Sequence, residues 1–403
     1  MSAKPQNPVK VLLWHWGRRG GGPNYTHELA AALAGRKEIE VHLSLSRQSE
    51  CFDRSMKLGL PGFQVDTYHG IASCLWATRR LPSLRNQMKN YLEQHKIDVV
   101  YCTMTHLWNL SMLDVIHEAG AGYLLTLHDA IFHPGERSRI RQMLLTKEIS
   151  QAQSIITLTS HVKKQLTDIY GYPSEQTNIV PHGPFSHGGD LIRSHPYPKG
   201  PFNILFFGRI LPYKGLDLLI SAYELIKKRF PEARLHIIGK GNLPINTDRL
   251  RELGVLLKNH WVPENEVNSI FAKADLLVTP YVESSQSGVI PLAYAKGLPV
   301  VATPVGGLTE QVADGFTGLI STRVNPRSFA DAVCQIISSP KLYEKLAANA
   351  LKMAKETIAW PRLASKVGKI ITGMCQYGIE TKCSPGKKAF SAKIYPKNTC
   401  SHL

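Results

Sequence analysis

Short apolar runs alternate with helical runs along almost the whole chain, and this alternation restricts the fold more than any other feature of the sequence. In the first half, apolar runs predict buried strands at residues 9–16, 99–103, 123–128, 154–158 and 178–181. Strands that alternate with helices form parallel sheets, because each connection between parallel strands has to cross over the sheet. The pattern therefore predicts an α/β protein whose parallel sheets are covered by helices on both faces.

A second set of alternating elements begins at residue 203, with strands predicted at 203–207, 235–238, 276–279 and 300–303. A chain of 403 residues is too long for one ordinary core and suits two domains. Prolines and glycines are concentrated between the two sets, in residues 183–201, which is typical of a linker. The expected boundaries are 1–185 for the first domain, 186–201 for the linker and 202–356 for the second domain.

The composition is that of a folded protein without a membrane span. Hydrophobic residues make up 43% of the chain, which excludes a disordered protein, and no apolar run approaches the roughly 20 residues that cross a bilayer. The first ten residues are polar and lack the apolar core of a signal peptide, so we expect a cytoplasmic protein. The cysteines are scattered and odd in number, which favours reduced thiols over disulfides or zinc; they are Cys51, Cys74, Cys102, Cys334, Cys375, Cys383 and Cys400.

The net charge of +17 calls for an anionic partner. Phosphorylated ligands, anionic membranes and nucleic acid fit, but no zinc motif or aromatic platform sequence indicates nucleic acid, so we expect none. One cluster interleaves cations with apolar residues; it contains Leu75, Trp76, Arg79, Arg80, Leu81, Leu84, Arg85 and Lys89. An amphipathic helix of this kind can lie on the inner face of an anionic membrane. A solvated basic helix face explains the pattern equally well, and the sequence leaves both interpretations open.

A run of glycines separates the first predicted strand from the first predicted helix, and it contains Gly20, Gly21 and Gly22. Glycines at such a turn let backbone amides approach an anion, and the helix N-terminus adds partial positive charge. These three residues are therefore candidates for anion binding, with Arg18 and Arg19 beside them. A tight turn without a ligand is the alternative interpretation.

Two cations flank the loop that follows the predicted strand at 203–207. They are Arg209, after Gly208, and Lys214. Fixed cations at this place can bind a diphosphate, and they can stabilise the negative charge that grows on it when it is the leaving group of a reaction. The guanidinium can grip two oxygens, whereas the ammonium acts as a point charge. We interpret Arg209 and Lys214 as catalytic, and Gly208 as allowing close approach of the backbone.

Further candidates follow the later strands of the second half. The amides of Ser287, Gly288 and Val289 precede a predicted helix and could bind a phosphate or a sugar hydroxyl. Glu283 and Glu310 are carboxylates in the loops after two strands. Both are candidate donor-binding residues, and a helix cap is the alternative for Glu310.

The segments 203–216, 280–303 and 305–310 resemble the C-terminal half of retaining glycosyltransferases of the two-Rossmann-domain (GT-B) type, the group 1 or family 4 class. The resemblance is closest over residues 200–325 and extends to 10–35 and 120–185. It implies two facing Rossmann-like domains, with a C-terminal helix at 357–375 that crosses back onto the first domain. It also implies a UDP- or GDP-sugar donor, a glycan or lipid-linked acceptor, retention of configuration and no cofactor. The residues that it places on the donor side are Gly20, Gly21, Gly22, Gly208, Glu283, Ser287, Gly288, Val289 and Glu310. Envelope or exopolysaccharide synthesis is the common bacterial use of this family.

The resemblance also assigns residues in the first half. Thr126-Leu127-His128-Asp129 ends a predicted strand, and His128 matches the family's histidine that contacts the transferred sugar, so it is interpreted as catalytic. Asp129 either orients this histidine or caps the loop. His133 and Glu136, further along the same loop, are assigned to the acceptor side.

The sequence departs from the commonest form of the family at one place. That form has two glutamates separated by seven residues, the first near the donor sugar and the second on the ribose. Alignment through residues 293–300 puts Leu292 at the second position and Ser284 at the first. Leucine cannot accept a hydrogen bond from the ribose, and Glu283 can replace the first glutamate only if the loop shifts.

No Asp-x-Asp motif and no metal-ligand spacing is visible in the sequence, so we expect a metal-independent hexosyltransferase with no metal site. Fold alone does not fix function, so two alternatives stay open. One is a sugar-nucleotide epimerase or phosphorylase, and the other is a non-catalytic subunit that binds lipid or protein. The C-terminal residues 376–403 are rich in lysine without periodicity and are expected to form a basic, disordered tail.

Overall fold

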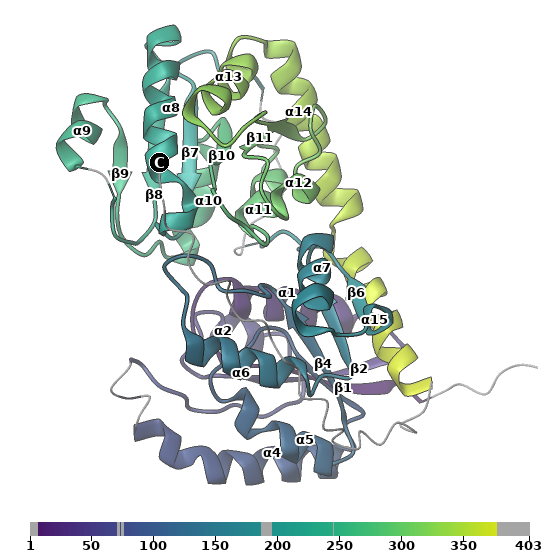
Figure 1. Ribbon diagram of the computed structural model, residues 1–403. Helices are drawn as coiled ribbons and strands as arrows, with labels where there is room; N and C mark the ends of the chain where they lie inside the picture. Colours follow the sequence, from purple (N-terminus) through teal and green to yellow (C-terminus); the bar gives the residue numbers. More distant parts are fainter. Residues whose placement is uncertain (1–6, 71–72, 74–75, 187–195, 245, 377–403) are drawn as a thin grey trace, which may run out of the picture. The chain divides into compact units, whose positions relative to one another are not determined.

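The computed structural model describes residues 7–70, 73, 76–186, 196–244 and 246–376 (Figure 1). These residues form two compact units. Among the described residues, the first unit comprises 7–130, 138–180 and 366–376, and the second comprises Ile131–Arg137 and Pro181–Ser365. Most of the expected linker and nearly all of the expected tail, together with Leu75, lie outside the described residues.

The first unit is built on a six-stranded sheet with the order β2-β1-β3-β4-β5-β6, in which all neighbours are parallel. Its strands are β1 (Val9–His15), β2 (Ile39–Leu45), β3 (Val99–Cys102), β4 (Gly122–Leu127), β5 (Ser154–Thr157) and β6 (Thr177–Ile179). Its helices are α1 (Gly21–Ala34), α2 (Phe52–Met56), α4 (Leu81–His95), α5 (Leu113–Glu118), α6 (Arg139–Ile149) and α7 (Ser160–Tyr170), with 3-10 turns η1 (Thr78–Arg80), η2 (Asn109–Ser111) and η3 (Ser174–Gln176).

The second unit repeats this plan with a six-stranded parallel sheet of order β12-β11-β10-β7-β8-β9. Its strands are β7 (Asn203–Phe207), β8 (Arg234–Ile238), β9 (Leu256–Lys258), β10 (Leu276–Thr279), β11 (Val300–Ala302) and β12 (Gly318–Ile320). Its helical elements are η4 (Pro212–Lys214), α8 (Leu216–Arg229), α9 (Thr247–Glu252), α10 (Glu264–Ala272), α11 (Val289–Ala295), α12 (Leu308–Gln311), α13 (Pro326–Ile337), α14 (Pro340–Lys352) and the π-helical turn η5 (Met353–Thr357).

The predicted fold class is confirmed, because both units are parallel sheets with helical connections. All nine strands expected from the sequence are present, with ends that differ by at most two residues. The sequence missed β9 and β12, which are edge strands of three residues each, although it predicted β6, an edge strand of the same length. It also missed β2, whose polar side chains are buried: His42 bonds to the Tyr91 hydroxyl at 2.6 Å, and Ser44 accepts from the Trp16 indole at 3.0 Å.

Helix α15 (Trp360–Gln376) belongs to both units (Figure 1). At its start, the Trp360 indole donates to the Pro184 carbonyl at 2.6 Å within the second unit. From Lys366 onward the helix is part of the first unit, where Val367 and Ile371 are fully buried. No helix in the described part of the chain has both the length and the apolar character needed to cross a membrane.

Candidate active site

The strand order of the second sheet defines where a ligand can bind. Strand β7 lies between β8 and β10, so the chain leaves β7 toward one side and later returns on the other. Such a switch point opens a crevice outside the carboxyl ends of the two strands. The loop after β7 carries Gly208, Arg209 and Lys214, and the loop after β10 runs from Pro280 to Gly288. The structure therefore brings these predicted residues to one edge of one sheet.

Glycines shape the loop after β7. Gly215 has φ +67°, and a Cβ there would lie 1.9 Å from the Pro280 carbonyl oxygen. Gly239, which follows β8, has φ +150°, and a Cβ there would lie 1.7 Å from the Gly208 carbonyl oxygen. No side chain fits at either position, so these glycines let the three loops pack backbone to backbone.

The two cations of this loop have different partners. The Arg209 side chain is 54% exposed, and its Nη1 donates to Glu136 Oε1 at 2.6 Å. The Lys214 ammonium lies 3.7 Å from the centre of the Tyr281 ring and 4.9 Å from that of Tyr213. Cation–π attraction therefore helps to hold Lys214 beside the loop after β10.

The loop after β10 is fixed by the side chain of Gln311 in α12. The Ser287 amide donates to Gln311 Oε1 at 2.6 Å, and Gln311 Nε2 donates to the Ser287 carbonyl at 3.1 Å. The Ser287 amide thus has a protein partner at the start of α11. Gly288 follows, and a Cβ there would lie 3.3 Å from His182 Nε2, while Val289 Cγ1 would lie 3.9 Å from a Cβ at Gly208.

Leu292 and Ser284 occupy the two positions that the alignment assigns to the glutamates of the commonest family form, and both side chains are buried. Leu292 is 2% exposed and belongs to the core of the second unit, so no carboxylate is presented there. Ser284 is also buried, and its hydroxyl donates within the loop to the Gln286 carbonyl at 3.0 Å. The carboxylate that this loop presents is Glu283, which is 39% exposed. Glu310 is exposed and lies on α12, in the connection between β11 and β12.

The structure places His133 and Glu136 beside the donor-side candidates of the second unit. Both belong to the segment Ile131–Arg137, which is part of that unit although it follows β4 in sequence. His133 bonds to Glu283 and Ser285, and Glu136 bonds to Arg209. The assignment of these two residues to the acceptor side therefore gains no support from their contacts.

The first sheet has a switch point of its own, because β1 lies between β2 and β3. The loop after β1 holds the glycine run. Gly20 has φ +86°, and its amide donates to Glu50 Oε1 at 2.6 Å. A Cβ on Gly22 would lie 2.5 Å from His15 Nε2, whereas a Cβ on Gly21 would meet nothing within 4 Å. Part of this run is therefore required for packing around His15.

Three histidines of the first unit are buried or half-buried near this switch point, and the sequence analysis identified only His128. Burial lowers the pKa of His15 to about 4, opposed by a hydrogen bond to the Met104 carbonyl and assisted by the charge of His128. Burial likewise lowers the pKa of His106 to about 3, assisted by His15 and Arg18. His128 donates from Nε2 to the Thr103 carbonyl at 3.0 Å, and burial lowers its pKa despite the adjacent Asp129.

Aromatic side chains and one arginine complete this region. His106 Nε2 lies 3.0 Å from the Tyr68 hydroxyl, and the Trp108 ring packs edge-on against both rings. The Arg18 guanidinium lies over the Tyr68 ring, 5.0 Å from its centre. His15 ends a buried strand, and this position is the only sequence signal that could have made it a candidate site residue. The same kind of position made His128 a candidate.

The basic cluster around α4 is partly neutralised. Arg85 makes a two-pronged ion pair with Asp114 of α5, at 2.7 and 2.6 Å, and Lys89 lies 3.7 Å from Glu118. The apolar face of α4 is buried in the first unit through residues that include Leu84. Trp76 is 69% exposed, with the Arg79 guanidinium 4.1 Å from its ring centre, and Arg80 is exposed as well.

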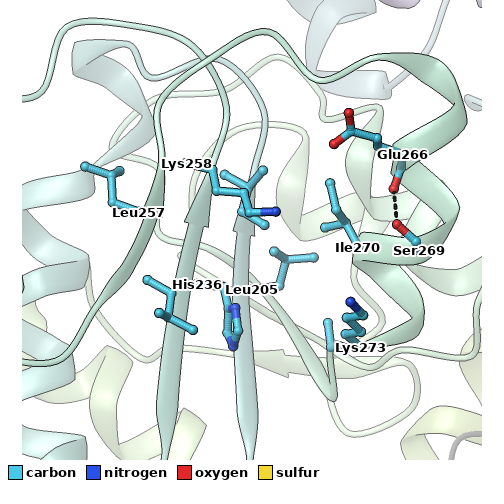
Figure 2. Close-up of a pocket in the computed structure, with 11 residues that line it drawn as sticks. Leu205, His236, Leu257, Lys258, Glu266, Ser269, Ile270 and Lys273 are labelled. Carbon is cyan, nitrogen blue, oxygen red and sulfur yellow. Dashed lines mark hydrogen bonds between the residues drawn. The ribbon is translucent and has the colours of Figure 1, made fainter.

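A cavity of about 300 Å³ lies between the sheet and α10 in the second unit (Figure 2). Its described lining includes Leu205, His236, Lys258, Ile270 and Lys273, and it contains no residue of the loops after β7 and β10. Within the described residues, no three His, Cys, Asp or Glu side chains converge as metal ligands do. Cys102, Cys334 and Cys375 are free thiols, Cys51 is buried, and Cys74, Cys383 and Cys400 lie outside the described part of the chain.

Comparison with known proteins connects these features to a family. The family described as Glycosyl transferases group 1 matches residues 201–339, and Glycosyltransferase Family 4 matches residues 19–183. The chain is 27% identical over 385 residues to the D-inositol 3-phosphate glycosyltransferase of Pseudarthrobacter chlorophenolicus, covering 87% of this chain and 89% of that protein.

Solved structures show the same fold. HepE of Anabaena, in complex with UDP and glucose, matches with a TM-score of 0.71 at 18% identity, covering 91% of this chain and 100% of that one. WaaG, a glycosyltransferase involved in lipopolysaccharide biosynthesis, matches with a TM-score of 0.62 at 18% identity, covering 91% and 100%. The two family matches lie one on each half of the chain, on the two parallel sheets. The chain therefore belongs to the group 1 glycosyltransferases, the class built from two Rossmann-like domains.

Proposed function

We propose that the protein transfers a hexose from a nucleoside-diphosphate sugar to a hydroxyl group of its acceptor, with retention of anomeric configuration. The observation that carries the proposal is the placement of Arg209 and Lys214 at the switch point of the second sheet, beside the Glu283 loop. HepE, which shares the fold, binds UDP, so a UDP-sugar is the first donor to test and a GDP-sugar the second. Gly208, Ser287, Gly288, Val289 and Glu310 would complete the donor side.

The transfer needs no group beyond these residues and the substrates. The bond between the anomeric carbon and the phosphate oxygen breaks, and its electrons move onto the diphosphate. Arg209 and Lys214 stabilise this charge more in the transition state than in the bound donor. The acceptor hydroxyl attacks the anomeric carbon from the same face, and its proton passes to the departing phosphate oxygen. In this scheme the two cations fill the electrostatic role of a divalent metal.

The acceptor would bind at the switch point of the first sheet. Gly20, Gly21 and Gly22 would approach the donor, and His128 would contact the transferred sugar. Arg18 with Tyr68, His106 and Trp108 offers the acceptor a cation among aromatic rings, with Asp129 on the acceptor side. Such a surface suits a sugar or polyol ring that carries an anionic group. A phosphorylated polyol matches the name of the Pseudarthrobacter relative, and a glycan or lipid-linked acceptor of envelope or exopolysaccharide synthesis matches that of WaaG.

The burial of Leu292 keeps a second interpretation open, a binding subunit without catalysis. Release of nucleoside diphosphate separates the two. We expect the purified protein to release UDP or GDP from one member of a nucleotide-sugar panel when a phosphorylated polyol or a lipid-diphosphate glycan is present, and to do so in excess chelator. Abolition by chelator with rescue by magnesium or manganese would contradict metal independence. Donor binding without turnover on any acceptor would support the binding subunit, and donor-sugar inversion without transfer would support an epimerase.

A peripheral position on the cytoplasmic face of an anionic membrane is part of the proposal, with the exposed patch of Trp76, Arg79 and Arg80 as the contact. We expect salt-sensitive binding to anionic vesicles. Replacing both Arg79 and Arg80 with Gln should weaken it roughly thirtyfold, since each cation near such a surface contributes about 1 kcal/mol. Arg85→Gln is the matched control, because Arg85 is already paired with Asp114. Equal effects of the two changes, or no vesicle binding at low salt, would contradict this contact.

A further inference from the structure

The segment Ile131–Arg137 is seated on the loop after β7, within the second unit. It contains no helix or strand. Gly135 has φ +89°, and a Cβ there would lie 2.8 Å from Pro212 Cδ, so the backbone approaches the loop closely. The ring of His133 stacks on Tyr213 with 4.6 Å between ring centres. The segment is therefore held beside the proposed diphosphate site by packing as well as by the ion pair of Glu136 with Arg209.

His133 connects two residues of the loop after β10. The Ser285 amide lies 3.2 Å from His133 Nε2, and the Ser285 hydroxyl lies 3.1 Å from the same nitrogen. A backbone amide can only donate, so Nε2 accepts and the proton of the neutral ring is on Nδ1. Nδ1 lies 2.9 Å from Glu283 Oε1 and therefore donates to it. The contacts fix both the tautomer and the orientation of a ring that is 6% exposed.

These contacts orient the Glu283 carboxylate but leave both of its oxygens able to accept further hydrogen bonds. Oε1 accepts from His133, and Oε2 lies 3.3 Å from Arg137 Nη2. A carboxylate offers about four acceptor sites, so each oxygen can accept a further hydrogen bond. The side chain is 39% exposed and belongs to the loop that borders the crevice after β10. A ligand hydroxyl can therefore reach a carboxylate whose direction is already set.

We propose that His133 is a positioning residue, which orients Glu283 to accept hydrogen bonds from hydroxyl groups of the donor sugar and so sets the preference among donor sugars. The proposal rests on the proposed function, because it takes the crevice after β7 and β10 as the donor site. Glu283 touches the sugar, and His133 acts through it. The two residues have different roles because their exposure differs. His133 is buried, whereas the Glu283 side chain is 39% exposed and can contact a ligand.

Two substitutions separate the two hydrogen bonds of the ring. In His133→Asn the amide nitrogen can replace Nδ1 and still donate to Glu283, but the bond from Ser285 is lost. In His133→Gln the amide oxygen can replace Nε2 and still accept from Ser285, but the donation to Glu283 is lost. Both changes remove the ring that stacks on Tyr213, so each is the control for the other, and thermal unfolding of both checks the fold.

The quantity to be measured is the gain in affinity from the sugar, which is the ratio of the Kd of the nucleoside diphosphate to the Kd of the nucleotide-sugar. Calorimetry would give Kd for UDP and UDP-glucose, and for GDP and GDP-mannose, with the wild-type protein and both variants. We expect UDP or GDP alone to bind all three proteins equally. The gain in affinity from the sugar should fall roughly ten- to a hundredfold in His133→Gln, the range for a hydrogen bond to a charged group, and much less in His133→Asn. Adding Glu283→Gln to His133→Gln should cause little further loss, because the two residues act as one unit.

Three outcomes would overturn the proposal. One is an unchanged contribution of the sugar in His133→Gln. Another is an equal loss in the Asn and Gln variants, which would reduce His133 to a packing residue on Tyr213. Failure of the wild-type protein to bind all four probes would overturn both this proposal and the proposed function. If binding changes as expected but no acceptor supports release of nucleoside diphosphate, only the proposed transfer falls.

Discussion

Replacing either Arg209 or Lys214 with Ala is expected to lower kcat by a few hundred-fold, about the effect of removing one electrostatic contact to a transition state. Both side chains lie in the loop after β7, where Arg209 is held by Glu136 and Lys214 lies over Tyr281. The phosphate oxygen that leaves the anomeric carbon carries more negative charge in the transition state than in the bound donor. The loss of donor affinity should therefore be milder than the loss of kcat.

Steady-state kinetics with the preferred donor would measure these effects. Arg229→Ala is the matched control, since Arg229 is an exposed arginine at the far end of α8 whose ion pair with Asp331 spans 2.8 Å. It should leave kcat unchanged. Arg209→Lys should fall between wild type and Arg209→Ala, because it keeps the charge but loses the fork that grips two oxygens. Near-normal activity of the Arg209→Ala, Lys214→Ala double variant would contradict the assignment of the diphosphate site.

The stability of the first unit is expected to fall steeply below pH 6.5. His15 and His106 have pKa values of about 4 and about 3, below the ordinary 6.5, so the unfolded chain binds protons that the folded unit rejects. Their contribution to stability is therefore present above pH 6.5 and is lost as the pH falls toward the folded values. Between pH 6.5 and 4.5 each histidine should lower the free energy of unfolding by about 2 kcal/mol.

Glu148 acts in the opposite direction. Its Oε1 accepts from Asn109 at 2.6 Å and from the Tyr123 hydroxyl at 2.7 Å, but burial outweighs these bonds and raises its pKa to about 7 from 4.5. A raised acid pKa contributes stability that is present below pH 4.5 and is lost as the pH rises through 7. Glu148 offsets the effect of roughly one of the two histidines, so the net loss of stability from these three groups between pH 6.5 and 4.5 should be about 2 kcal/mol.

Glu148→Gln tests whether Glu148 opposes the two histidines in the pH dependence of the free energy of unfolding. The variant lacks the offset, so its loss of stability over the same interval should be about twice that of the wild-type protein, at about 4 kcal/mol. Relative to wild type it should gain stability as the pH rises from 4.5 to 7.5. Urea unfolding across this interval measures both curves. Glu118→Gln, an exposed carboxylate on α5, is the control and should run parallel to wild type. A parallel curve for Glu148→Gln as well would show that Glu148 titrates normally.

Much of the fold could be predicted from the sequence because its information is local. Runs such as Ile204 to Phe206 are buried on both faces of a parallel sheet and therefore read as continuous apolar segments. The missed strands β9 and β12 are edge strands of three residues each. The departure at Leu292 was also visible, since a leucine stands where the related transferases have a carboxylate, and burial in the core explains it.

Part of the candidate site could likewise be inferred before the structure. Glycines and cations at the end of a predicted strand fall near the carboxyl edge of the sheet whatever the rest of the fold is, which made Gly208, Arg209 and Lys214 visible. Strand order, which a single sequence does not state, then determines that the loop carrying Glu283 is the neighbour of the loop carrying Arg209.

The sequence by itself thus determined the fold class and the residues whose place follows from their own strand. Tertiary structure alone decided the partnerships between distant side chains. His133 and Glu283 are 150 positions apart, and His15 and Met104 are 89 apart. A hydrogen bond between distant polar groups requires only one residue at each end, so it produces no periodicity in the sequence. The same holds for the buried carboxyl of Glu148, because the pKa of a side chain depends on what the folded chain packs around it.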